Sequence, residues 1–72
     1  MTTVTLADLR AARLCFAGAR PWFRRHGLDW QGFLAHGLDA EVLRATGDPL
    51  ALRVVAVAEA RKARERKAAA HG

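Results

Sequence analysis

The chain contains no tyrosine, serine, asparagine or isoleucine, and it has a single cysteine, Cys15. With one cysteine, no disulfide can form within the chain. The residues from Met1 to Leu6 have neither the basic start nor the apolar stretch of a secretory signal, so we expect a cytoplasmic protein. No run approaches the roughly 18 consecutive apolar residues of a membrane-spanning helix. These shortages exclude a secreted disulfide scaffold and a membrane channel.

The length of 72 residues suffices for one small domain. With 51% hydrophobic and 26% charged residues, the chain is too apolar to be disordered throughout. About a dozen large side chains, each stabilising by ~1.5–3 kcal/mol when buried, oppose an ordering entropy of comparable size. We therefore expect a folded but marginally stable domain, to which a partner or formation of a homo-oligomer would add stability.

Three similar joints punctuate the chain: His26-Gly27-Leu28-Asp29, His36-Gly37-Leu38-Asp39 and Thr46-Gly47-Asp48-Pro49. Glycine is favoured just past a helix end, and an aspartate after it accepts hydrogen bonds from the first amides of the next helix. The joints predict helices over residues 6–14, 19–26, 29–36, 39–45 and 49–67. The first two helices are either separate or one helix kinked near Pro21. No segment has the alternation of a strand, so we expect no sheet.

The fold class that follows is all-α, a compact bundle of four to five short helices with a longer C-terminal helix. In the last helix, Leu50, Val54 and Val57 share one face, with Leu52 and Val55 beside it, and this apolar face ends near Ala60. Residues 59–72 carry three arginines and two lysines against two glutamates. We therefore expect one helical domain over residues 1–60 and a basic extension over 61–72, helical or frayed.

All the aromatic side chains lie between Phe16 and Phe33, which makes that stretch the expected centre of the core. They either pack there, with a tryptophan half exposed, or form a recognition surface, because tryptophan flanked by arginine is common at binding hot spots. Arg20 and Arg24 lie four residues apart on one helix, and Arg13 would join them only if the first two helices were continuous. The candidate partner-binding residues are Arg20, Trp22, Arg24, Arg25 and Trp30.

The basic extension offers a second candidate surface, made of Arg61, Lys62, Arg64, Arg66 and Lys67. Cations around most of a helix would attract nucleic acid without sequence preference. The same composition also suits a solvated helix end, where Arg61 and Glu65 pair one turn apart. A helix-turn-helix built on the last two helices fits poorly, because the start of the second would present apolar residues to the bases.

Neither catalysis nor a bound cofactor is expected. Cys15 lies among apolar neighbours, where an inert buried thiol is the norm, and Asp29 and Asp39 already have a capping role. Cys15, His26 and His36 lack the close paired spacing of metal ligands. The sequence therefore predicts a protein that is not an enzyme and has no cofactor or metal.

One string of residues resembles small helical proteins encoded by tailed bacteriophages and prophages. It comprises Gly18-Ala19-Arg20, Trp22-Phe23, His26-Gly27-Leu28-Asp29-Trp30, Phe33, Gly37, Leu43, Thr46-Gly47-Asp48 and Ala51-Leu52. The resemblance implies a phage accessory protein without catalytic residues, which binds a host or phage protein. An inhibitor of a host machine, such as a CRISPR defence complex, is one such role. Alternatives are a nucleic-acid-binding protein acting through the basic extension and a small virion-assembly subunit.

Overall fold

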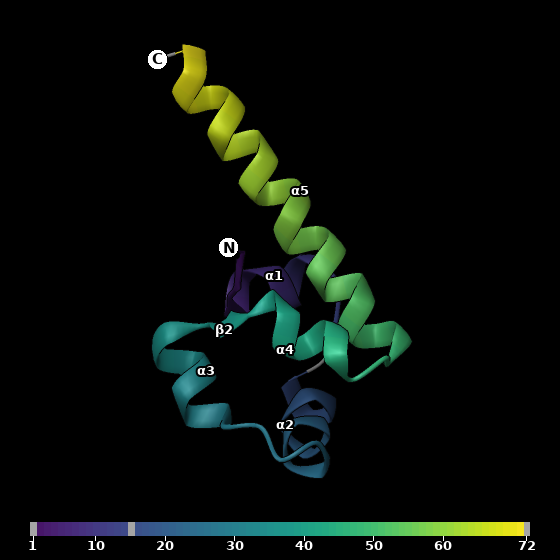
Figure 1. The fold of residues 1–72 in the computed structure, drawn as a ribbon. Coiled ribbons are helices and arrows are strands. Elements are labelled where there is room, and N and C mark those ends of the chain that lie inside the picture. Colours follow the sequence, from purple (N-terminus) through teal and green to yellow (C-terminus); the bar gives the residue numbers. More distant parts are fainter. Residues whose placement is uncertain (1, 15, 72) are drawn as a thin grey trace.

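The computed structural model describes residues 2–14 and 16–71, without the side chains of Phe16 and of residues 69–71. In chain order the elements are β1 (Thr3–Val4), α1 (Leu6–Ala11), α2 (Phe16–Arg25), α3 (Trp30–His36), β2 (Leu38–Asp39), α4 (Ala40–Ala45) and α5 (Pro49–His71). The long helix α5 crosses α1 and α4, and its last turns project away from the other elements (Figure 1). The expected all-α bundle with a longer last helix is confirmed.

The expectation that the chain has no sheet is wrong, because β1 and β2 form a small antiparallel pair. Thr3 lies opposite Asp39, and Val4 opposite Leu38. Beyond the pair, the amide of Ala40 donates to the carbonyl of Thr2 at 2.9 Å. Strands of two residues are too short to show alternation in a sequence. The pair nevertheless positions the N-terminal segment, where Val4 is fully buried in the core.

The glycine joints end helices as predicted. Gly27, Gly37 and Gly47 have φ values of 66°, 79° and 69°. After α2, the amide of Gly27 donates to the carbonyl of Arg24 and that of Leu28 to the carbonyl of Phe23, at 3.1 and 2.8 Å. Bonds of this pattern close a helix with glycine in the left-handed conformation. Leu28, which follows the glycine, packs against the core.

Two of the three predicted aspartate caps form. Asp39 accepts from the amide of Glu41 at 3.0 Å and Asp48 from that of Leu50 at 2.8 Å. Asp29 stands at the N-cap of α3, but its side chain makes no capping hydrogen bond. Its carboxylate lies instead against Gly32, where an added Cβ would be 2.5 Å from Oδ2. The prediction for Asp29 is therefore wrong, although the helix starts where expected.

The first two helices are separate, which resolves the alternative left open by the sequence. Arg13 follows α1 with a left-handed φ of 61°, and the amides of Arg13 and Leu14 donate back to the carbonyls of Arg10 and Leu9. This is the closure seen at Gly27, made here by a residue that adopts it less readily. Pro21 lies inside α2 and does not start it.

The core consists of side chains from every helix, around Phe23 and Phe33. Each of these rings is 2% exposed, and their centroids are 4.9 Å apart. In α5, Val54 and Val55 are buried as predicted, and Val57 is half-buried. Leu50 and Leu52 were expected on the same face but are 47% and 45% exposed. Ala51 and Ala58 take the inner positions, because small side chains let a helix lie close to its neighbours.

Candidate partner-binding surface

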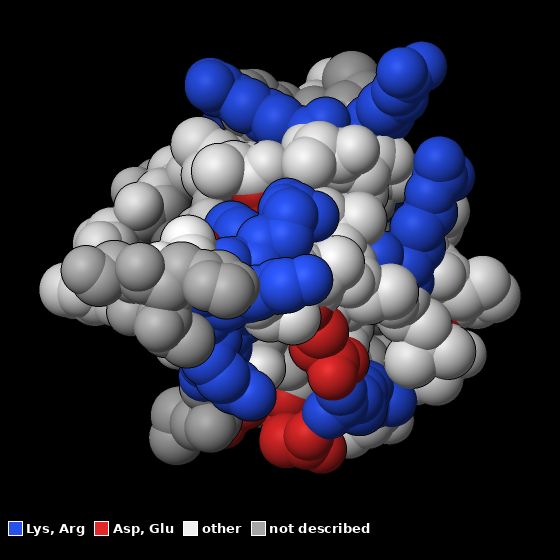
Figure 2. Space-filling model, turned by 90° about the horizontal axis from the view of Figure 1, so that it is seen from above, with Lys and Arg blue, Asp and Glu red and all other residues white. Residues whose placement is uncertain are grey.

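The net positive charge is concentrated in one segment. Between Asp8 and Asp29 the chain carries five arginines and no acidic residue, and these arginines are Arg10, Arg13, Arg20, Arg24 and Arg25. All seven acidic residues lie elsewhere, where they balance the remaining lysines and arginines, so this segment accounts for the whole formal charge of +5. Counting charge between successive acidic residues would have revealed this from the sequence. In the view of Figure 2, cationic side chains lie on several sides, whereas acidic ones gather in a smaller area.

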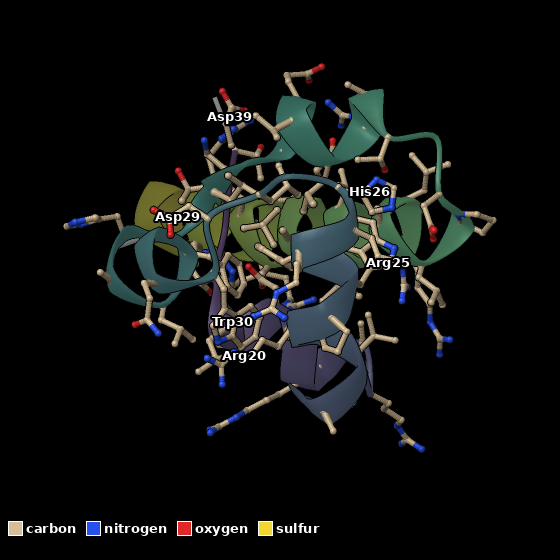
Figure 3. The ribbon with its side chains drawn as sticks, turned by 90° about the horizontal axis from the view of Figure 1, so that it is seen from below. Arg20, Arg25, His26, Asp29, Trp30 and Asp39 are labelled. Carbon is tan, nitrogen blue, oxygen red and sulfur yellow. The ribbon has the colours of Figure 1, made fainter. Side chains whose placement is uncertain are left out.

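Three of these arginines form what we call the basic α2 surface: Arg20, Arg24 and Arg25. All are exposed, and no described residue gives any of the three a hydrogen-bond or ion-pair partner. Arg20 and Arg24 share a face of α2, whereas Arg25 leaves the helix on the side of His26 (Figure 3). Arg13 does not extend this face, because α1 and α2 are separate helices. The guanidinium groups are thus available to anions outside the molecule.

Trp22 lies on the same helix and connects α2 to α5. Its indole Nε1 donates to Oδ2 of Asp48 at 3.0 Å, and its ring lies 4.2 Å from that of His26. The hydrogen bond from Trp22, followed by the one from the Leu50 amide, lowers the pKa of Asp48 below its usual value. Trp22 is half-buried. The indole N–H of Trp22 is therefore already bonded within the protein, and only part of the side chain is accessible to a partner.

Trp30, the other tryptophan expected at the site, serves mainly as packing. Its ring lies 5.1 Å from that of Phe23, edge to face, and 5.6 Å from that of Phe33. The side chain is half-buried against the core. Arg20 lies on the Trp30 side of α2 in Figure 3. The structure thus agrees with the packing interpretation of the aromatic residues, in which the tryptophans are half exposed.

An apolar cleft of about 480 Å³ opens beside Arg25 of the basic α2 surface, on a different face of α2 from Arg20 and Arg24. Its floor consists of buried core residues, including Leu9, Phe23 and Val54. Its rim is formed by exposed or half-buried residues of α2, the segment before it and the start of α5, namely Leu14, Gly18, Pro21, Trp22, Arg25 and Leu50. Arg25 is the only charged residue among the described residues that line it. Sequence reasoning missed the cleft, because Leu14 and Leu50 meet only in the fold.

The basic extension begins with an arginine that is fully engaged. Arg61 donates from Nε to Oδ1 of Asp8 at 2.8 Å and from an Nη to Oδ2 at 3.2 Å, and it also donates to the Thr3 carbonyl at 3.0 Å. The predicted pair with Glu65 is present as well, at 3.1 Å. Arg61 therefore joins α5 to the N-terminal segment and is not a free cation.

Asp8 is the acceptor at the centre of this contact. Burial alone would raise the pKa of its carboxyl group, but hydrogen bonds from Arg61 and from the amide and hydroxyl of Thr5 lower it below the usual value. Beyond this contact α5 remains helical, with Arg64, Arg66 and Lys67 exposed and Lys62 half-buried. Of the predicted nucleic-acid-binding residues, Arg61 therefore has a structural role, whereas Arg64, Arg66 and Lys67 are exposed to solvent.

Neither a metal centre nor a membrane-spanning helix emerges from the described part of the chain. No three histidine, cysteine, aspartate or glutamate residues there lie close enough together to hold a metal ion. None of the helices described is both long and apolar enough to cross a bilayer. Cys15, which we expected to be a buried thiol, lies outside the described residues.

Comparison with known proteins gives no relative. No protein-family model matches the chain, and no significant match was found among curated proteins or solved structures.

Proposed function

We propose that the chain is a small, non-enzymatic accessory protein of a tailed bacteriophage or prophage, and that it binds another protein through the basic α2 surface. The observation that carries the proposal is that Arg20, Arg24 and Arg25 are exposed and unpaired within a segment without acidic residues. An acidic surface on a host or phage protein would supply the missing carboxylates. Inhibition of a host machine, such as a CRISPR defence complex, is the kind of role that the phage resemblance implies.

The surroundings of these arginines favour a protein over nucleic acid as the partner. Pro21 is exposed between Arg20 and Trp22, and Trp22 is half-buried. Arginine and aromatic residues around an apolar centre are the composition enriched at protein–protein interfaces. Arginine also forms paired hydrogen bonds with carboxylates, which gives such a contact orientation as well as attraction.

The test is an affinity purification from a bacterial host lysate, with half of each sample treated with nuclease. Arg20→Glu combined with Arg24→Glu should abolish capture of a defined protein that survives nuclease. The matched control is Arg64→Glu combined with Arg66→Glu, which makes the same change in net charge on α5. Circular dichroism must show the same helix content in both variants.

Two results would contradict the proposal. If the variant of Arg20 and Arg24 captures the same protein as the unmodified chain, the basic α2 surface is not the interface. If all recovery disappears after nuclease treatment, the partner is nucleic acid. The paired variants then show which surface binds it.

Nucleic-acid binding through the end of α5 is the second candidate, favoured by the placement of Arg64, Arg66 and Lys67. They are exposed on turns that project beyond the other elements (Figure 1). In this case the variant of Arg64 and Arg66 loses DNA affinity, and binding by the unmodified chain weakens with salt at a slope of about −0.9 for each phosphate neutralised. Arg61 is left unchanged in this test, because it forms an ion pair with buried Asp8.

A further inference from the structure

We infer that the apolar cleft beside the basic α2 surface receives an apolar side chain from an acidic segment of the partner protein. The inference rests on the proposed protein-binding function and specifies how the partner is recognised. Its basis is the combination of an apolar cleft of about 480 Å³ with the unpaired Arg25 on its rim, in a segment of the chain that carries five arginines and no acidic residue.

The size and lining of the cleft suit an anchoring side chain. Pockets that bury a drug-sized ligand are typically about 300–1,000 Å³, so this cleft has room for one or two apolar side chains. Here buried Leu9, Phe23 and Val54 form an apolar floor, and exposed Leu50 extends the apolar surface outward from the start of α5. An aromatic or leucine side chain inserted from outside would exchange contact with water for contact with this apolar floor, and desolvated anchors of this kind contribute most to binding.

The charges around the cleft determine what flanks the anchor. Arg25 is on the rim, and Arg20 and Arg24 lie on the same helix, all without a partner among the described residues. A carboxylate next to the anchor would pair with Arg25, whereas Arg20 and Arg24, on another face of α2, attract an acidic segment only at longer range. Electrostatic complementarity of this kind speeds association. The occupant is therefore an acidic segment, such as an amphipathic helix, with one or two apolar residues facing the cleft.

Other occupants fit less well. A second copy of the chain would bring the same five arginines against each other in a symmetric contact, which like-charge repulsion disfavours. A nucleic acid needs an aromatic face for an unstacked base, but the Trp22 ring already lies against His26. The apolar lining also gives a phosphate no donor apart from Arg25.

Gly18 offers a way to fill the cleft without unfolding the protein. It lies on the rim within α2, and a Cβ built on it meets nothing within 4 Å. In Gly18→Leu the new side chain therefore has room, and replacing glycine inside a helix favours folding. Ala17→Leu is the matched control, because Ala17 is exposed on the same helix and does not line the cleft.

The probe is a synthetic helical peptide of about 15 residues, composed of glutamate and alanine with one Phe and one Leu a turn apart. Two control peptides replace every Glu by Lys, or replace Phe and Leu by Ala. Binding is followed by the indole N–H signals in a ¹H–¹⁵N NMR spectrum. The chain has two tryptophans, and of these only Trp22 lines the cleft, so its signal should move while that of Trp30 stays.

We expect the acidic Phe/Leu peptide to move the Trp22 signal and neither control peptide to do so. Gly18→Leu should weaken binding at least about tenfold, or 1.4 kcal/mol, and Ala17→Leu should leave it unchanged. The inference is overturned if the acidic peptide moves no signal at about 1 mM, or if Gly18→Leu binds it as well as the unmodified chain. A shift of the Trp22 signal by a DNA oligonucleotide, without one by the peptide, would assign the cleft to nucleic acid.

The lysate purification separates this inference from the proposed function. If Gly18→Leu still captures the protein that the variant of Arg20 and Arg24 loses, the basic α2 surface binds a partner but the cleft does not. If both variants capture it, the proposed interface itself is wrong. Loss of capture by both variants, with Ala17→Leu unaffected, is the result that supports both.

Discussion

Asp8 is the only charged residue that is buried in the described part of the chain, with 1% of its surface exposed. Its two oxygens accept hydrogen bonds from Arg61 and from Thr5, so the carboxylate is satisfied without water. A buried carboxylate that loses its cation is destabilising, because the remaining charge has little solvent to stabilise it. The contact between Asp8 and Arg61 therefore connects the stability of α1 to that of α5.

Arg61→Ala should strongly destabilise the fold. We expect the free energy of unfolding to fall by about 3–5 kcal/mol, the usual cost of removing one partner of a buried ion pair. Urea denaturation followed by circular dichroism measures the change. Arg64→Ala is the control, since Arg64 is exposed one turn further along α5, and its cost should stay within about 0.5 kcal/mol. Equal losses in the two variants would show that Arg61 contributes no more than an exposed arginine.

Acidification should weaken the fold through the same carboxylate. The folded state lowers the pKa of Asp8 below its usual value of 3.8, so the unfolded chain takes up a proton first as the pH falls. The stabilisation is complete above pH 3.8 and is lost as the pH falls through the lower pKa of the folded state. Unfolding by urea between pH 6 and pH 2 should show this loss, and Asp8→Asn should have a shallower dependence. A residual slope is expected from Asp48, whose pKa is also lowered. An identical slope in Asp8→Asn would contradict this account.

At the scale of elements, the joint between α3 and β2 depends on one glycine more than the others do. Gly37 has φ 79° and ψ −173°, a conformation that is open essentially to glycine alone. A Cβ there would lie 2.6 Å from Thr3 Cγ2 and 2.8 Å from the Val4 carbonyl oxygen. The small sheet thus passes directly against this glycine.

Gly37→Ala should destabilise the protein more than Gly47→Ala. At Gly47 an added Cβ meets nothing within 4 Å. Gly47→Ala is therefore destabilised only by the left-handed backbone conformation, which costs an alanine roughly 1–2 kcal/mol. At Gly37 the collision with β1 adds to a backbone strain of about 1–3 kcal/mol. Thermal unfolding of the two variants gives the comparison. Similar melting temperatures would mean that β1 moves aside at little cost.

The helices could be predicted from the sequence because their ends are marked locally. Gly27, Gly37 and Gly47 act within one turn of the chain, and so do the caps made by Asp39 and Asp48. The small sheet was missed, because its pairing of Thr3 with Asp39 depends on the fold and not on local pattern. The exposure of Leu50 and Leu52 was also missed, since helical spacing alone does not show which face approaches its neighbours most closely.

The candidate site was predictable only in part, for a similar reason. The spacing of Arg20 and Arg24 indicated a shared face, and both are exposed on α2. The bond from Trp22 to Asp48 joins residues 26 positions apart, and the contact of Arg61 with Asp8 spans 53 positions. Contacts of such separation depend on how the helices pack. The cleft likewise exists only where α2 meets the start of α5.

For the whole molecule, the projecting end of α5 can be divided at Glu65. Up to this residue the helix holds Arg61, which binds Asp8 and pairs with Glu65 itself. A chain that ends at Glu65 should therefore keep its stability, whereas a chain that ends at Glu59 should lose about 3–5 kcal/mol with the buried pair. Urea denaturation of the two truncated chains tests this, and equal stabilities would show that Arg61 is dispensable. The chain that ends at Glu65 also lacks Arg66 and Lys67 but keeps the contact of Arg61 with Asp8. Any DNA affinity that this chain loses therefore belongs to the end of α5 and not to partial unfolding.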